Sequence, residues 1–250
     1  MNKIIASLLV GGVLIAFSAC DIIEGATGVV PPTPTQSGGG GGANPLTNQE
    51  VVSGLKEALE IGITNAVDIT SKTNGFLGND EIRIPFPESA QRMKDQALEW
   101  GLDNQVNNIV ETMNRAAEDA AKEATPIFVN AIKNMTVNDG FAILNGGQGA
   151  ATNFLKRNTS DQLVEAFSPR VQNSIEKVKL TEYWEPVTTR YNQAVRFTGG
   201  ERVDTDLNQY VTTRAIDGLF TMVEKEEDKI RLDPAARVTD LLSRVFGSQK

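Results

Sequence analysis

The chain has 250 residues, with 24 basic and 32 acidic side chains and a net charge of −8. This acidic balance argues against a nucleic-acid partner, because phosphate binding needs a basic surface. The chain has no histidine and a single cysteine, Cys20, which excludes histidine-based catalysis, histidine-ligated metals and an internal disulfide. We predict no metal site and no cofactor.

Residues 1–19 have the organisation of a lipoprotein signal peptide. Lys3 supplies the positive start, and the apolar stretch from Ile4 to Phe17 is too short to span a membrane. Phe17-Ser18-Ala19-Cys20 resembles the lipobox of bacterial lipoproteins, in which the cysteine is lipidated and becomes the mature N-terminus. The alternative is an ordinary secretory peptide. The resemblance implies acyl chains such as palmitate on Cys20, and therefore a membrane partner and a place in the cell envelope, at the periplasmic face or the cell surface.

Residues 20–45 have the composition of a tether. Pro31, Pro32 and Pro34 favour extended structure, and the glycines at 38–42 favour a flexible coil. Such a segment cannot bury enough apolar surface to fold alone. Its relaxed reach is about 30 Å, which would hold a domain away from a membrane surface.

Residues 46–250 are predicted to form one all-α domain of roughly eight to ten helices with one short extended strap. Thr47 and Glu50 form a T-x-x-E capping box at the first helix. The strap follows at Ile82–Phe86, where prolines exclude a central strand. A second helix is expected over 88–100, and Asp103 is expected to cap a third, whose many alanines would place it centrally.

The remaining elements follow from proline, glycine and capping residues. Pro126 restarts a helix, and Thr136 with Asp139 caps the next one, which ends at 145–147. Separate helices are expected over 150–155, from Ser160 and from Ser168-Pro169. Three more are expected over 183–195, from Asp206 to 230, and from Asp233-Pro234 to 247. The charged run at 224–229 is predicted to be a solvated face.

Short runs that are typical of one protein family follow one another along the whole domain. They are Gly54-Leu55-Lys56-Glu57-Ala58-Leu59, Ile82-Arg83-Ile84-Pro85, Met113-Asn114-Arg115-Ala116-Ala117-Glu118, Ile143-Leu144-Asn145-Gly146-Gly147, Ala150-Ala151-Thr152, Tyr210-Val211, Ala215-Ile216-Asp217-Gly218-Leu219-Phe220 and Asp240-Leu241-Leu242. In these runs residues 50–247 resemble the bacterial family catalogued as domain of unknown function 4197. The resemblance implies a helical, often exported protein, and it implies no catalytic residues.

Two clusters are candidate sites. Asn114, Arg115 and Glu118 share one helix face, because they are three and four residues apart. They form either an anion pocket or, as we favour, a buried polar clamp between helices. The second is a turn that contains Gly146, Gly147, Gly149 and Thr152. Glycines before a helix can present N–H groups to an anion, although a simple tight turn is the favoured interpretation.

A third set of charges lies near the C-terminus, and the ordinary interpretation is helix-end electrostatics and surface ion pairs. Its members are Arg214, Asp217, Arg231, Asp233, Arg237 and Asp240. Paired carboxylates can also serve as the acid and base of a glycosidase, but no particular pair is selected. We therefore predict a non-catalytic binding or structural lipoprotein. The alternative is a carboxylate-based hydrolase or lyase that acts on envelope material. Any catalytic residues remain unknown.

Overall fold

The computed structural model describes residues 46–177, 180–203, 206–237 and 239–247. Residues Asn44–Lys250 group as one compact unit. The predicted signal peptide, Cys20 and the tether lie outside the described residues, so the fold below concerns the helical domain alone.

The described residues form nine α-helices, two short 3-10 turns and no strand, which confirms the predicted all-α class. The helices are α1 (Asn48–Ser71), α2 (Gln91–Glu99), α3 (Asp103–Ala121), α4 (Ala124–Lys133), α5 (Val137–Asn145), α6 (Ala150–Lys177), α7 (Leu180–Thr198), α8 (Asn208–Leu232) and α9 (Asp240–Gly247). The 3-10 turns are Glu88–Ala90 and Pro234–Ala236.

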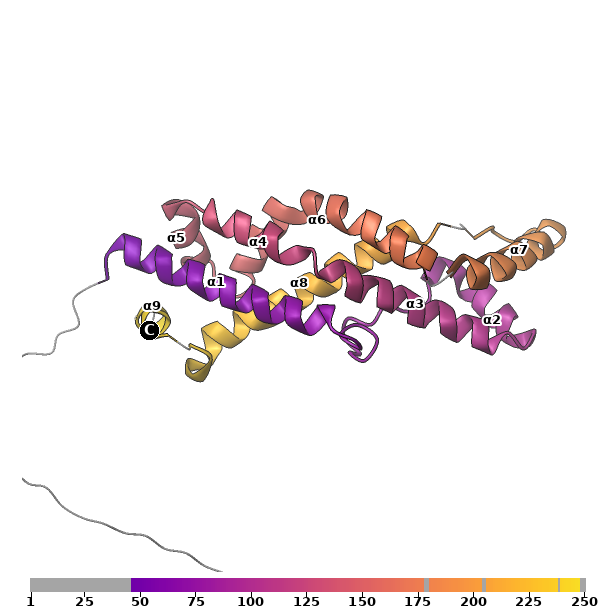
Figure 1. Cartoon of the computed structure of the whole chain (residues 1–250), viewed down its shortest axis with the longest axis horizontal. Helices are drawn as coiled ribbons and strands as arrows, with labels where there is room; N and C mark the ends of the chain where they lie inside the picture. The colour runs from indigo at the N-terminus through magenta and orange to yellow at the C-terminus, as the bar shows by residue number, and fades with distance from the viewer. Residues whose placement is uncertain (1–45, 178–179, 204–205, 238, 248–250) are drawn as a thin grey trace, which may run out of the picture. The chain divides into compact units, whose positions relative to one another are not determined.

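Helix α8 is the central element of the domain. It packs against α1, α3 and α6, and α6 in turn packs against α3 and α4 (Figure 1). Helices α2 and α7 lie together at one end of this bundle, whereas α5 and α9 both pack against α1 at the other end. A side chain on the inner face of α8 can therefore meet three neighbouring helices.

Two helix starts follow the capping signals in the sequence. The Thr47 side chain accepts a hydrogen bond from the Glu50 N–H, and the Glu50 carboxylate accepts one from the Thr47 N–H. Thr136 and Asp139 form the same reciprocal pair at α5. These hydrogen bonds lower the pKa of Asp139 below its ordinary value, because they stabilise the carboxylate.

Helix α3 is central, as its alanines predict. Its inner face consists of fully buried small residues that let the neighbouring helices approach closely; these are Ala116, Ala117, Ala120 and Ala121. The strap crosses this region with Ile82, Ile84 and Phe86 buried, and it forms no strand in the described structure. The strap therefore closes one side of the core.

The strap and its preceding loop approach α8 most closely at Gly218. A Cβ atom built there would lie 2.6 Å from the Phe76 ring and 3.1 Å from Ile82. We expect Gly218→Ala to lower the free energy of unfolding by about 1–3 kcal/mol, because the core must shift to admit the methyl group. Urea unfolding checks this, with Gly247→Ala as the control, since a Cβ there would meet nothing within 4 Å. Equal midpoints for the two variants would contradict the close approach.

The three helices predicted over 150–177 form one continuous helix, α6, so the predicted breaks at Ser160 and Ser168-Pro169 are wrong. Neither serine caps a helix. Ser160 Oγ donates to the Lys156 carbonyl oxygen at 2.6 Å, and Ser168 Oγ donates to Asn208 Oδ1 at 3.0 Å. The helix continues through Pro169 because an unbroken apolar face is buried on both sides of it; this face includes Leu155, Leu163, Phe167 and Val171.

Three predicted helix starts also shift. Asp103 is the first residue of α3 and makes no capping hydrogen bond, so its contribution is to the helix dipole. Asp206 lies one residue before Leu207, the N-cap residue of α8, and its side chain accepts a hydrogen bond from the Asn208 N–H at 2.8 Å. Asp233 accepts from the Ala235 N–H at 2.9 Å, and this local turn competes with helix, so α9 begins only at Asp240.

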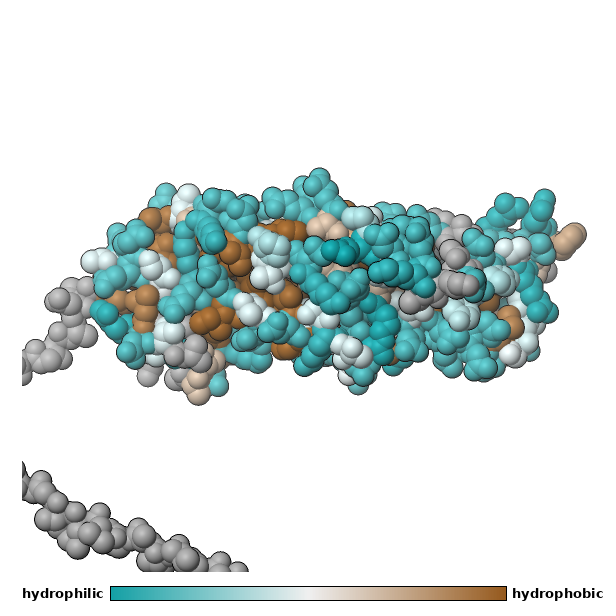
Figure 2. Space-filling view, in the orientation of Figure 1, coloured by the Kyte–Doolittle hydropathy of each residue, from teal (hydrophilic) through white to brown (hydrophobic). Residues whose placement is uncertain are grey.

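The domain surface carries apolar side chains singly. The exposed large ones, Leu98, Val137, Val164, Phe197 and Leu232, lie on five different helices. Figure 2 shows brown surface along α1 and α4, broken up by polar residues. Partly buried side chains such as Val51 and Ile127 belong to these helices. Scattered apolar groups of this kind are ordinary for a soluble surface.

Candidate functional site

Asn114 on α3 joins that helix to the strap. Its side-chain Oδ1 accepts from the Ile84 N–H at 2.8 Å, and its Nδ2 donates to the Ile84 and Val110 carbonyl oxygens at 2.8 Å each. The amide thereby pairs with the strap as a neighbouring strand would. It is fully buried, and both of its polar atoms have partners.

Glu118 lies one turn further along α3 and holds the loop after α1. Its Oε1 accepts from the N–H groups of Phe76 and Leu77 at 3.2 Å each, and its Oε2 accepts from Arg115 Nη1 at 2.8 Å. The hydrogen bond to Glu118 raises the pKa of the Arg115 guanidinium above its ordinary value. Arg115 also donates to Asn74 Oδ1 at 2.9 Å.

The structure thus brings Asn114, Arg115 and Glu118 together with partners from the protein itself. The Glu118 side chain is only 6% exposed, whereas the Arg115 side chain is 31% exposed. These contacts are those of a clamp between α3, the strap and the 74–77 loop. The polar atoms of Asn114 and Glu118 already make hydrogen bonds within the protein. Few hydrogen-bond donors therefore remain at this place for an anionic ligand.

The glycine turn leads into the N-terminus of α6. The anion that is bound there is a carboxylate of the protein itself. Gly147 and Gly149 have positive φ angles of 74° and 72°, which glycine adopts without steric cost. The N–H groups of Ala151 and Thr152 donate to the Glu227 carboxylate at 3.1 and 2.9 Å. The Thr152 hydroxyl donates to the same carboxylate at 2.8 Å. The anion is therefore a side chain of α8.

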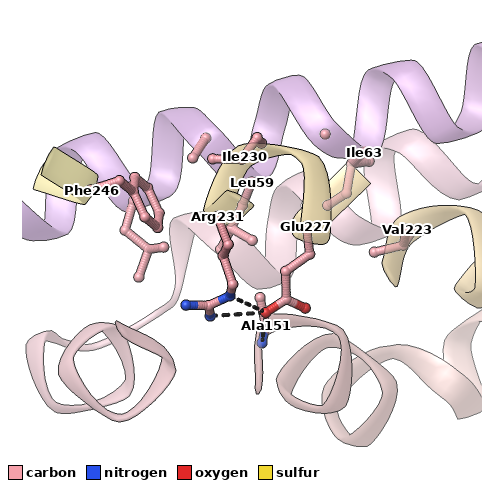
Figure 3. Close-up of a pocket in the computed structure, with 11 residues that line it drawn as sticks. Leu59, Ile63, Ala151, Val223, Glu227, Ile230, Arg231 and Phe246 are labelled. Atoms are coloured by element: carbon pink, nitrogen blue, oxygen red, sulfur yellow. Dashed lines mark hydrogen bonds and ion pairs between the residues drawn. The ribbon is translucent and has the colours of Figure 1, made fainter. Parts of the chain in front are cut away.

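Arg231 completes this buried group. Its Nε donates to Glu227 Oε1 at 2.9 Å and its Nη2 donates to the Ile143 carbonyl oxygen at 2.9 Å. The side chains of Glu227 and Arg231 are 4% and 10% exposed. In Figure 3 both point from α8 towards Ala151 at the start of α6. The ion pair thus links the end of α5, the start of α6 and α8.

The predicted solvated face at 224–229 is therefore wrong for two of its members. Glu226 and Glu227 are both buried. Glu226 accepts from Asn65 Nδ2 at 3.1 Å and pairs with Lys229. Both glutamates are three or four residues from Val223 and from Ile230, so the helix period places them on its apolar inner face.

A small hollow lies beside the Glu227–Arg231 pair. Its volume is about 20 Å³, which is close to the least that holds one water molecule. Apart from these two residues its lining is apolar and comes from α1, α6, α8 and α9: Leu55, Ala58, Leu59, Gly62, Ile63, Ala151, Val223, Ile230 and Phe246 (Figure 3). We interpret it as a packing gap in the core.

The third set of charges does not form one cluster. Arg231 is bound to Glu227, and Arg237 donates to the carbonyl oxygens of Ile230 and Arg231 at 3.1 and 2.8 Å, which completes the end of α8. Arg214 lies 3.9 Å from Glu88. Asp217 lines two surface hollows of about 170 and 220 Å³ on either side of α8.

The widest of these hollows, about 440 Å³, lies between α4, α5 and α6 and was missed in the sequence. We call it the amide groove; its lining residues are Asn130, Ala131, Asn134, Asp139, Phe154, Arg157, Asn158 and Gln162. The sequence does contain a pattern that marks the groove, namely two pairs of amide side chains at the i, i+4 spacing of one helix face. These pairs are Asn130 with Asn134, and Asn158 with Gln162. Each pair alone is typical of any solvated helix.

Among the described residues, no three metal-binding side chains gather at one place. Within the same ranges, every helix is too short or too polar to cross a bilayer.

The sequence of the domain can be compared with known proteins. No match was found among curated proteins, and none among solved structures. A family model described as "Protein of unknown function (DUF4197)" matches residues 45–247, which are most of the chain and include every described residue. The chain therefore belongs to the DUF4197 family.

Proposed function

We propose that this protein is a lipid-anchored, non-catalytic binding domain of the bacterial cell envelope. The lipobox at Cys20 and the tether support the location. The observation that carries the binding role is the contrast between interior and surface. The buried charged groups Glu118, Glu227 and Arg231 are paired internally, whereas the amide groove on the surface is open and polar.

The hollow beside the buried Glu227–Arg231 pair is too small for a substrate. The hollow beside Glu227 holds about 20 Å³, whereas ligand pockets usually measure about 300–1,000 Å³. Catalytic acids and bases also need a free proton or lone pair aimed at a substrate. Both Glu227 oxygens already accept hydrogen bonds from backbone, hydroxyl or guanidinium groups. These features support binding at the surface.

The alternative, a carboxylate-based hydrolase or lyase, has two candidate pairs among the described residues, and both include Asp217. Glu81 and Asp217 line the hollow of about 170 Å³, but Glu81 is already paired with Lys225. Asp217 and Glu224 line the same hollow of about 220 Å³. They are seven residues apart on α8, which is an axial rise of about 10 Å. The two carboxyl groups of a glycosidase lie about 5–9.5 Å apart and flank the bond between them. The rise refers to the backbone positions alone, and the two side chains remain the candidate pair that the following experiment tests.

Catalysis is tested by incubating the purified full chain with peptidoglycan and with lipopolysaccharide and measuring newly formed reducing ends. We expect no release above buffer. Release that Asp217→Asn or Glu224→Gln abolishes would establish the hydrolase and overturn the non-catalytic proposal. Thr221→Ala, which removes an uncharged group from the same hollow, is the matched control.

The anchor has its own test. We expect Cys20→Ser to move the protein from the membrane fraction to the soluble fraction or to block its processing, because the variant has no thiol to accept acyl chains. Fractionation and immunoblotting measure this. Ser18→Ala, which keeps a small residue ahead of Cys20, is the control and should remain in the membrane fraction. If Cys20→Ser is retained as tightly as the parent, the lipoprotein proposal fails.

A further inference from the structure

We propose that the amide groove is an oligosaccharide-binding site. This inference rests on the proposed function, in which the domain binds a ligand of the envelope at its surface, and it names the class of that ligand. The groove is formed by α4, α5 and α6.

The size of the groove fits a small ligand. Its volume of about 440 Å³ lies within the usual range for ligand sites, about 300–1,000 Å³. The other three hollows, at about 20, 170 and 220 Å³, fall below that range. An open groove of this kind suits several residues of a chain molecule better than one enclosed metabolite.

Many polar atoms in the groove make no hydrogen bond within the described residues. Asn134 Nδ2 donates to Asn130 Oδ1 at 3.3 Å, which leaves the Asn130 amino group and Asn134 Oδ1 unused. Asn158 donates one hydrogen to the Phe154 carbonyl oxygen at 2.7 Å and keeps its own Oδ1. Within the described part of the chain, neither Arg157 nor Gln162 makes a side-chain hydrogen bond.

This set of groups matches sugars in its chemistry. An amide both donates and accepts hydrogen bonds, as does a hydroxyl group, so neighbouring amides can pair with neighbouring hydroxyl or acetamido groups. The guanidinium of Arg157 adds donors in a fixed plane, and Asp139 adds its Oδ1 as an acceptor, since its Oδ2 already accepts from Thr136. Two amides come from each of α4 and α6, so a ligand along the groove meets both walls.

Charge and polarity exclude the other common ligands. Arg157 and Asp139 have opposite charges, and the groove has no second cation to hold a nucleic acid or another polyanion. Its apolar lining is limited to Ala131 and to Phe154, which is 8% exposed. A lipid chain or an apolar peptide anchor would need a larger hydrophobic surface. A nearly neutral, hydroxyl-rich ligand remains.

The test is a titration of the full chain with tetra-N-acetylchitotetraose and with maltotetraose, monitored by NMR. The detergent must lack a sugar headgroup, because a glucoside or maltoside would compete for the groove. We expect the side-chain amide signals of Asn130, Asn134, Asn158 and Gln162 to shift with at least one of the two sugars. The signal of Asn173, an exposed amide on α6 outside the groove, should stay in place.

Substitutions separate the groove from the rest of the surface. We expect Arg157→Ala and Gln162→Leu each to weaken the affinity about tenfold or more, because each removes hydrogen bonds to the sugar. The matched controls, Arg196→Ala and Asn173→Ala, should bind as the parent does. All four residues are exposed, so their melting temperatures should agree, which excludes misfolding as the cause of weak binding.

Three results would overturn the inference: no shift of the groove amides at 10 mM of either sugar, unchanged affinity in both groove variants, or equal shifts with inorganic phosphate. The last would identify a simple anion site. These results remove the oligosaccharide as the ligand of the groove. The lipid anchor and the absence of catalysis are tested separately, by the fractionation of Cys20→Ser and by the release of reducing ends. Conversely, release of sugar from the bound oligosaccharide would overturn the non-catalytic proposal and leave the groove assignment intact.

Discussion

Replacing Glu227 with alanine should lower the free energy of unfolding by about 3–5 kcal/mol, because a buried ion pair then loses one partner. Arg231 would be left with a buried guanidinium, and the N–H groups of Ala151 and Thr152 at the start of α6 would lose their acceptor. A loss of this size is a large part of the about 5–15 kcal/mol that stabilises a typical domain. Urea unfolding followed by circular dichroism measures it.

The matched control for this prediction is Glu224→Ala, one turn earlier on the same helix. Glu224 is exposed, so this substitution should change the stability by less than about 0.5 kcal/mol. The double variant Glu227→Ala/Arg231→Ala should cost less than the sum of the single changes, because it removes both charges together. Strictly additive costs would show that the pair is not coupled and would contradict the anion assignment at α6.

The fold could be predicted from the sequence wherever a local signal decides the structure. The Thr47–Glu50 and Thr136–Asp139 boxes mark helix starts because both partners lie within four residues of each other. The continuity of α6 could not be predicted in that way. Ser160 and Ser168 are common capping residues, and only their tertiary setting shows that they bond elsewhere.

The candidate site shows the same division between local and distant information. Helical spacing alone places Arg115 beside Glu118. The partners that identify their role, the N–H groups of Phe76 and Leu77, are 42 and 41 residues away in the chain. Glu227 meets α6 at a separation of 75–76 residues. The charged run at 224–229 is typical of a solvated helix face in the sequence. Only the packing of α8 shows that one side of this run is buried.

Replacing Glu118 with alanine should have an effect of similar size, about 3–5 kcal/mol. The substitution leaves the N–H groups of Phe76 and Leu77 without an acceptor and leaves Arg115 without its nearest carboxylate. Glu111→Ala is the control, because Glu111 also pairs with Arg115 but at 3.5 Å and with 56% of its side chain exposed. That control should cost less than about 1 kcal/mol.

Arg115→Ala should cost less than Glu118→Ala, about 1–3 kcal/mol, and the asymmetry distinguishes a clamp from an anion pocket. Glu118 would still hold two N–H groups after Arg115 is removed, and the partly exposed guanidinium gains less from its pairing than a buried one would. In the double variant the ion pair with Glu118 is lost only once, so the total cost should be clearly less than the sum of the two single changes. If instead Arg115 waits for an anionic ligand, the free protein carries a strained positive charge. Thermal melts of Arg115→Ala at or above the parent temperature would then reveal a pocket and refute the clamp.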